Sequence, residues 1–88
     1  MNTADVHKKT FEVLSKQLKV SINQISEEKR LSEDLGADSM NRAECVMYLE
    51  EVFNITINDV QALQLLTVQD IINCVLKKIE EKNLLNKR

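Results

Sequence analysis

Apolar residues recur every three or four positions in three stretches of the chain, which is the spacing of residues on one face of an α-helix. The pattern predicts helices from about Ala4 to Leu18, from Asp38-Ser39 to Phe53, and from Val68 to about Lys82. The residues expected to face inward are Val6, Thr10, Phe11, Leu14 and Leu18 in the first helix, Met40, Ala43, Val46, Leu49 and Phe53 in the second, and Val68, Ile71, Ile72, Val75, Leu76 and Ile79 in the third.

Polar residues that suit a helix N-terminus stand at the start of each stretch. Thr3 and Asp38 are the expected N-caps of the first two helices, since a short side-chain oxygen can accept a hydrogen bond from a free backbone N–H of the first turn. Thr67, with Asp70 three residues later, resembles a capping box in which Asp replaces the usual Glu.

The helical spacing fails between Lys19 and Asp38, which predicts a long loop. Four apolar residues are spaced to anchor this loop to the core: Ile22, Ile25, Leu31 and Leu35. A structureless loop near twenty residues is unusual in a small domain and is more often functional than idle. Gly36, the only glycine, ends it, which indicates a backbone with positive φ or a close approach of another chain segment.

A short helix is predicted between the second and last long ones, capped by Asn58 or Asp59 and ending at about Leu65. The chain has 88 residues, no proline and 3% aromatic residues, so it is expected to fold as one all-α domain with an aliphatic core. The predicted fold is a small four-helix bundle, with three main helices, one short helix and a long loop between the first two. Residues 4–82 of the single domain 1–88 are expected to be structured, and the basic tail 83–88 is expected to fray.

Charge is unevenly distributed along the chain. Residues 32–59 contain seven acidic residues and a single basic one, Arg42, for a net charge of −6, whereas residues 1–31 and 60–88 each carry +2. The acidic middle indicates a partner with a basic surface and argues against nucleic acid binding there, although a merely solvated face would look the same.

Several classes of protein are disfavoured by what the chain contains. No apolar run approaches the ~18 residues of a membrane helix, and residues 1–14 do not resemble a signal peptide, so no membrane insertion and a cytoplasmic location are expected. Cys45 and Cys74 form no metal-ligand motif and are interpreted as small buried hydrophobes, with a disulfide or a metal as alternatives. His7, the only histidine, is expected on the surface, and no set of catalytic residues is found. The chain is therefore expected not to be an enzyme.

Ser39 is the candidate for chemistry. A serine at a helix start is ordinarily only a first-turn residue. Here, however, the loop and Gly36 would present its hydroxyl at an exposed helix N-terminus, where the helix dipole and free N–H groups favour a negatively charged phosphodiester.

The segment Glu33-Asp34-Leu35-Gly36-Ala37-Asp38-Ser39-Met40 resembles the pattern around the modified serine of the acyl carrier protein family, which reads acidic-Leu-Gly-x-Asp-Ser-Leu. Residues 44–53 resemble the acidic second helix of that family, residues 55–59 the loop into its third helix, and residues 67–70 the start of its last helix. The matches are in register and cover nearly the whole chain.

The resemblance implies a four-helix fold in which a phosphopantetheinyl transferase attaches 4′-phosphopantetheine from coenzyme A to Ser39. Asp38 would serve transferase recognition as well as capping, and Gly36 would set the loop geometry. The positions implied to contact partners are Glu44, Met47, Glu50 and Glu51, together with Arg42. The implied partners are acyl-loading, ketosynthase, reductase, dehydratase or acyltransferase enzymes with basic docking surfaces, and a monomer is expected.

The chain departs from the family pattern at several positions. Asn41 and Arg42 follow the serine where the family is usually acidic, Asn58 replaces a common proline, and Val60 and Leu63 stand in an often acidic third helix. Val60 and Leu63 could extend the core or form an apolar docking patch. These changes suggest a specialised carrier or one adapted to the partners of its own organism.

Three functions remain open at this point. The leading one is acyl shuttling in fatty acid or lipid biosynthesis. The alternative is a dedicated carrier for a polyketide, peptide or aminoacyl pathway, which would use the same Ser39. A more remote alternative is an unmodified helical adaptor that docks through its acidic helix.

Overall fold

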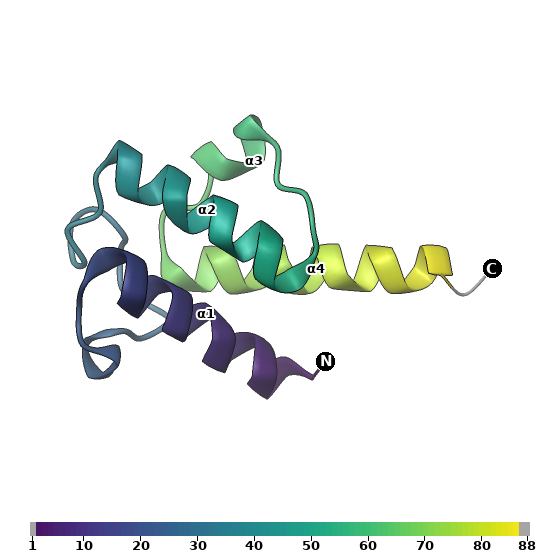
Figure 1. The fold of residues 1–88 in the computed structure, drawn as a ribbon, viewed down its shortest axis with the longest axis horizontal. Coiled ribbons are helices and arrows are strands. Elements are labelled where there is room, and N and C mark those ends of the chain that lie inside the picture. Colours follow the sequence, from purple (N-terminus) through teal and green to yellow (C-terminus); the bar gives the residue numbers. More distant parts are fainter. Residues whose placement is uncertain (1, 87–88) are drawn as a thin grey trace.

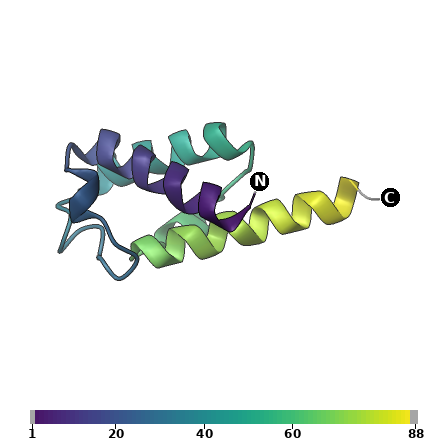
Figure 2. The same cartoon turned by 90° about the horizontal axis from the view of Figure 1, so that it is seen from below.

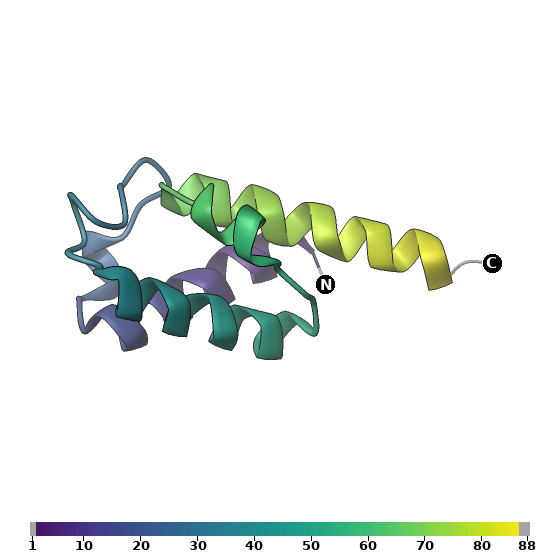
Figure 3. The same ribbon diagram turned by 90° about the horizontal axis from the view of Figure 1, so that it is seen from above.

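The computed structural model describes residues 2–86, and it confirms an all-α fold. Its helices are α1 (Thr3–Leu18), α2 (Ser39–Phe53), α3 (Asp59–Leu63) and α4 (Val68–Asn86), with one 3₁₀ turn at Ile22–Gln24. Helix α1 packs against both α2 and α4 (Figure 1). The short α3 lies between α2 and α4 on the other side of the bundle (Figure 3).

The core is aliphatic, and its largest fully buried side chains come from all three long helices: Val6, Leu14, Leu49, Val68, Ile71, Ile72 and Val75, with the polar Thr10 among them. Most of the predicted inward positions are confirmed, although Phe11, Leu18, Val46, Leu76 and Ile79 are only half-buried.

The inward face predicted for α2 was partly wrong. Met40 is 73% exposed and Ala43 is also exposed, whereas Cys45, Leu49 and Phe53 form the buried stripe. These three residues follow one another at four-residue spacing and so lie on one face of the helix. Met40 lies in the first turn of α2, at the end of the helix, where it is not covered by the core.

The caps of the helices follow the sequence closely. Thr67 Oγ1 accepts a hydrogen bond from the backbone N–H of Asp70 at 3.1 Å, and Asp70 Oδ2 accepts from the N–H of Thr67 at 3.0 Å, so the predicted capping box is confirmed. Asn58 caps α3, which ends at Leu63, two residues before the predicted end. In α1 the cap is Asn2 and not Thr3, because Asn2 Oδ1 accepts from the N–H of Asp5 at 2.8 Å.

Helix α4 is longer than predicted. It continues past Lys82 to Asn86, so residues 83–86 of the expected frayed tail are helical, while Lys87 and Arg88 lie outside the described residues. Its last turns project beyond the rest of the bundle, and Leu84 and Leu85 are exposed there (Figure 2). Lys82 Nζ donates to the carbonyl of Asn54 at 3.0 Å, which ties α4 to the end of α2.

The loop from residue 19 to 38 is fixed against the start of α4. The N–H of Leu31 donates to the carbonyl of Leu66 at 2.9 Å, and the N–H of Val68 donates to the carbonyl of Lys29 at 3.0 Å. Ile25, Leu31 and Leu35 are buried as predicted, but Ile22 is 43% exposed and is not an anchor. The Ile22–Gln24 turn is held by its own capping box, so it needs no contact with the core. None of the described helices is long and apolar enough to cross a membrane.

Candidate functional site

Ser39 is the first residue of α2, and its side chain is exposed. The preceding residue, Asp38, caps the helix: its Oδ1 accepts from the N–H of Asn41 at 2.8 Å, while Asn41 Oδ1 accepts a longer bond from the N–H of Asp38 at 3.4 Å. The Asp38 carboxylate is exposed, so it keeps acceptor capacity for a partner. The start of α2 therefore presents a hydroxyl and a carboxylate side by side at the positive end of a 15-residue helix.

Gly36 turns the chain into this helix start. Its φ is +71°, which confirms the positive φ predicted from the sequence. No heavy atom lies within 4 Å of the position that a Cβ would take at Gly36, so a close approach does not explain the glycine. The glycine is needed for its backbone conformation alone.

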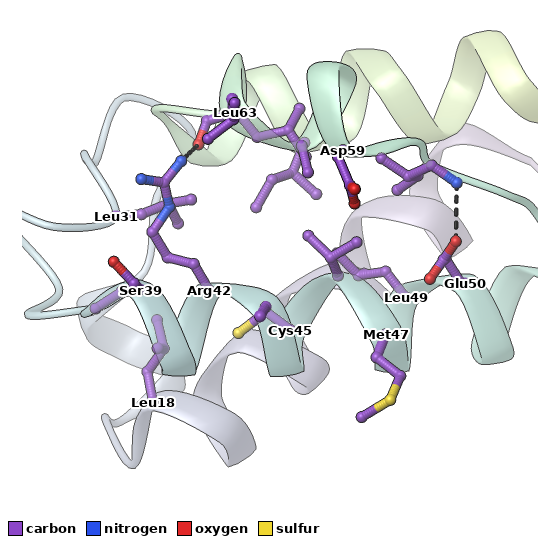
Figure 4. Close-up of a pocket in the computed structure, with 17 residues that line it drawn as sticks. Leu18, Leu31, Ser39, Arg42, Cys45, Met47, Leu49, Glu50, Asp59 and Leu63 are labelled. Carbon is purple, nitrogen blue, oxygen red and sulfur yellow. Dashed lines mark hydrogen bonds between the residues drawn. The ribbon is translucent and has the colours of Figure 1, made fainter.

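A cavity of about 500 Å³ opens beside Ser39 between α2 and α3 (Figure 4). Its walls are mainly aliphatic, with Leu31, Val46, Leu49, Ile57, Leu65 and Ile71 among them. Ser39 and Arg42 lie at one end of this cavity and Glu50 at the other (Figure 4). A mostly apolar cavity next to an exposed hydroxyl suits an apolar chain tethered at that hydroxyl.

Two charged side chains of α2 reach across to the backbone on either side of α3. Arg42 Nη2 donates to the carbonyl of Leu65 at 2.9 Å, and Glu50 Oε2 accepts from the N–H of Ile57 at 2.9 Å. Arg42 was expected to contact partners, but it is half-buried and lines the cavity. Sequence reasoning missed these two links because their partners are backbone groups, which no side-chain pattern reveals.

The other residues implied to contact partners differ in exposure. Met47 is 51% exposed and Glu51 is exposed, while Glu44 is intermediate. The three lie at positions i, i+3 and i+7 and therefore share one face of α2. Val60 and Leu63 are 66% and 75% exposed, so they do not extend the core.

The two cysteines are free thiols. Cys45 is buried and lines the cavity, and burial, together with the nearby Glu44 charge, raises its pKa to about 11. Cys74 is only half-buried and not buried as predicted, and this partial burial also raises its pKa. Both thiols are therefore mainly protonated near neutral pH, as expected for small hydrophobic residues. Within residues 2–86, no group of three or more His, Cys, Asp or Glu side chains could hold a metal ion.

Comparison with known proteins bears on this site directly. A family model described as "Phosphopantetheine attachment site" matches residues 9–75. The acyl carrier protein of Cyanidium caldarium is 36% identical over 78 residues, which cover 89% of this chain and 91% of that protein. That of Chlorobium phaeobacteroides is 36% identical over 89% of this chain and 100% of its own length, and that of Wolinella succinogenes is 45% identical over 73% and 84%. The chain belongs to the acyl carrier protein family.

The prosthetic group of this acyl carrier protein is 4′-phosphopantetheine. The residues at the start of α2 fit such a group, because an exposed hydroxyl, helix N–H groups and an adjacent apolar cavity meet there. The anionic end of the group would lie at the positive end of α2, and an apolar cargo would have a cavity within the same molecule.

Proposed function

We propose that Ser39 Oγ is the attachment point of 4′-phosphopantetheine and that this protein carries acyl groups between the enzymes of fatty acid or lipid biosynthesis without catalysing a reaction itself. The observation that carries the proposal is the exposed Ser39 hydroxyl at the N-terminus of α2, beside an apolar cavity. When bound, the group supplies a terminal thiol that holds the acyl chain as a thioester.

The attachment step needs an external enzyme. Ser39 Oγ forms a bond to the phosphorus atom that bears the pantetheine, the pyrophosphate bond of coenzyme A breaks, and adenosine 3′,5′-bisphosphate leaves. The Ser39 proton passes to a base of the phosphopantetheinyl transferase. We assign this base to the transferase; the chain fixes the start of α2 through the Asp38 cap, whose Oδ1 accepts the N–H of Asn41. Its role in this step is to present the hydroxyl on a rigid helix start.

Asp38 and the exposed face of α2 are the proposed recognition elements. Asp38 lies directly before Ser39 and is exposed, so a basic transferase surface can reach it. Glu44, Met47 and Glu51 lie on one face further along the helix, where a basic enzyme with an apolar contact point would dock. Glu50 already accepts a hydrogen bond from the N–H of Ile57, so it would contribute its charge to docking more than a direct contact with the enzyme.

The lining of the cavity favours an acyl cargo over an aminoacyl one. Its lining is dominated by aliphatic side chains, which suit hydrocarbon and offer few partners to a charged ammonium group. A dedicated carrier for polyketides remains the second candidate, because its cargo can also be apolar, and the group isolated from the native cells distinguishes the two.

The test is intact mass after incubation with coenzyme A and a broad-specificity phosphopantetheinyl transferase. Wild type and Ser32→Ala, which removes an exposed loop serine, are expected to gain one phosphopantetheine each, and Ser39→Ala none. If Ser39→Ala gained the group, the attachment site would lie elsewhere. If folded wild type failed to gain it, even with a transferase from its own source, the adaptor function would replace the carrier function.

A further inference from the structure

Within residues 2–86, Arg42 is a cation without an anionic partner. It is the only basic residue between Arg30 and Lys77, and the segment around it is strongly acidic. Among the described residues, however, no carboxylate lies within ion-pair distance of its guanidinium. Its hydrogen bond goes instead to the uncharged carbonyl of Leu65, across the end of the cavity (Figure 4).

The bond from Arg42 to the Leu65 carbonyl holds one end of α3, a weakly anchored helix. None of the five residues of α3 is buried, so the helix depends on what flanks it. Ile57 before it and Leu65 after it are buried, and each is tied to α2 by one charged side chain, Glu50 and Arg42 respectively. Of the two links, the Arg42 link is the one at the Ser39 end of the cavity (Figure 4).

Arg42 is also placed to meet an anion on Ser39. The two residues are three positions apart on α2, where side chains are neighbours with Cβ atoms about 5–6 Å apart, and both line the same cavity. A phosphodiester on Ser39 would stand beside the Asp38 carboxylate, so its charge needs a nearby cation. A guanidinium binds phosphate oxygens through paired N–H donors and gains a charge attraction that a carbonyl does not give.

We propose that Arg42 is a positioning residue for the prosthetic group, and that its guanidinium exchanges the Leu65 carbonyl for the phosphodiester when Ser39 is modified. The inference rests on the proposed attachment at Ser39. Modification then does two things: it fixes the anionic end of the arm near the cavity, and it releases the end of α3 that borders the cavity. Loading with the prosthetic group thereby prepares the space that receives the acyl chain.

The test compares unmodified and modified full-length protein by NMR, for wild type, Arg42→Gln and the control Lys9→Gln. The control removes the same charge from an exposed position on α1. Two amides report on the end of α3, since Gln64 and Leu65 donate to the carbonyls of Gln61 and Ala62. In wild type and in Lys9→Gln, modification is expected to speed hydrogen exchange at both amides about fivefold, the factor for one lost hydrogen bond. In Arg42→Gln, exchange is expected to be fast already and to change little.

A second readout follows the anion directly. The ³¹P chemical shift of the phosphodiester is expected to differ between wild type and Arg42→Gln and to be the same in wild type and Lys9→Gln. The chemical shift of the Arg42 Nε–H is expected to change on modification. This inference alone would be overturned if hydrogen exchange at Gln64 and Leu65 were unchanged in modified wild type. It would also be overturned if the ³¹P chemical shift were the same in wild type and Arg42→Gln. Intact mass separates that result from failure of the proposed function, which would appear as no modification at all.

Discussion

Asp38 caps α2, and we propose that its charge also serves recognition by the transferase; substitution at this one position distinguishes the two roles. Its carboxylate caps α2 through the 2.8 Å bond from the N–H of Asn41, and its charge lies next to Ser39, where the transferase would bind. Asp38→Ala removes both the cap and the charge, whereas Asp38→Asn and Asp38→Ser remove the charge and keep a capping oxygen.

The expected loss in the free energy of unfolding follows from the capping bond and the charge that each substitution removes. Loss of a good N-cap costs ~1 kcal/mol, and the interaction of a negative charge with the helix dipole adds ~0.3–1 kcal/mol. Asp38→Ala is therefore expected to lower the free energy of unfolding by about 1–2 kcal/mol, and Asp38→Asn by only the smaller dipole contribution. For a domain of this size each kcal/mol corresponds to a fall of about 4–8 °C in Tm.

Urea and thermal unfolding followed by circular dichroism measure the stability that the cap contributes. The rate of phosphopantetheine addition in an intact-mass time course measures recognition by the transferase. The rate is expected to fall strongly for both Asp38→Ala and Asp38→Asn, although only the alanine variant is markedly less stable. If Asp38→Asn were as unstable as Asp38→Ala, the capping argument would be refuted. If Asp38→Asn were modified as fast as wild type, the charge would have no part in recognition.

Three further predictions concern single sites. Gly36→Ala is expected to lose ~1–2 kcal/mol in urea unfolding, because φ is +71° and no neighbour obstructs a methyl group, and a much larger loss would reveal a contact that the structure does not contain. Thr10→Val is expected to gain about 1 kcal/mol, since Thr10 Oγ1 is buried with no hydrogen-bond partner among the described residues, and a loss of stability would contradict this. In the single-thiol variant Cys74→Ser, alkylation of Cys45 by iodoacetamide at pH 8 is expected to be about a hundredfold slower than for a thiol of pKa 9.0. The rate should continue to rise toward pH 11, because the pKa of Cys45 is about 11, and a plateau near pH 9 would refute the burial argument.

Local features of the fold were predictable from the sequence because their partners lie close together in it. The caps at Asp38 and Asn58 and the box of Thr67 and Asp70 each join residues three positions apart. The positive φ of Gly36 was likewise predicted from the only glycine in a loop that leads to a helix. These features need no knowledge of the tertiary arrangement.

Features that depend on the tertiary arrangement were not predictable in the same way. The buried face of α2 contains Cys45 and excludes Met40, a result fixed by what lies across from each turn of the helix. Arg42 lies half-buried at the cavity because α3 brings the Leu65 carbonyl within its reach. Ser39 was predicted as the attachment point from its motif, but the cavity beside it is lined by residues from Leu18 to Ile71, which only the tertiary fold brings together.

The arrangement of α2 suits a small bundle that would hold an apolar cargo in its cavity and keep its fold. One face of α2 buries Cys45, Leu49 and Phe53 in the core, and Cys45 and Leu49 line the cavity together with Arg42 and Val46. The opposite wall comes largely from the α3 region, where α3 buries none of its own residues and is held by the buried Ile57 and Leu65 on either side of it. The largest fully buried side chains lie in α1, α2 and α4, and none lies in α3. We therefore expect an acyl chain in the cavity to move α3 more readily than the long helices, while Ser39 stays on a helix whose position the core fixes.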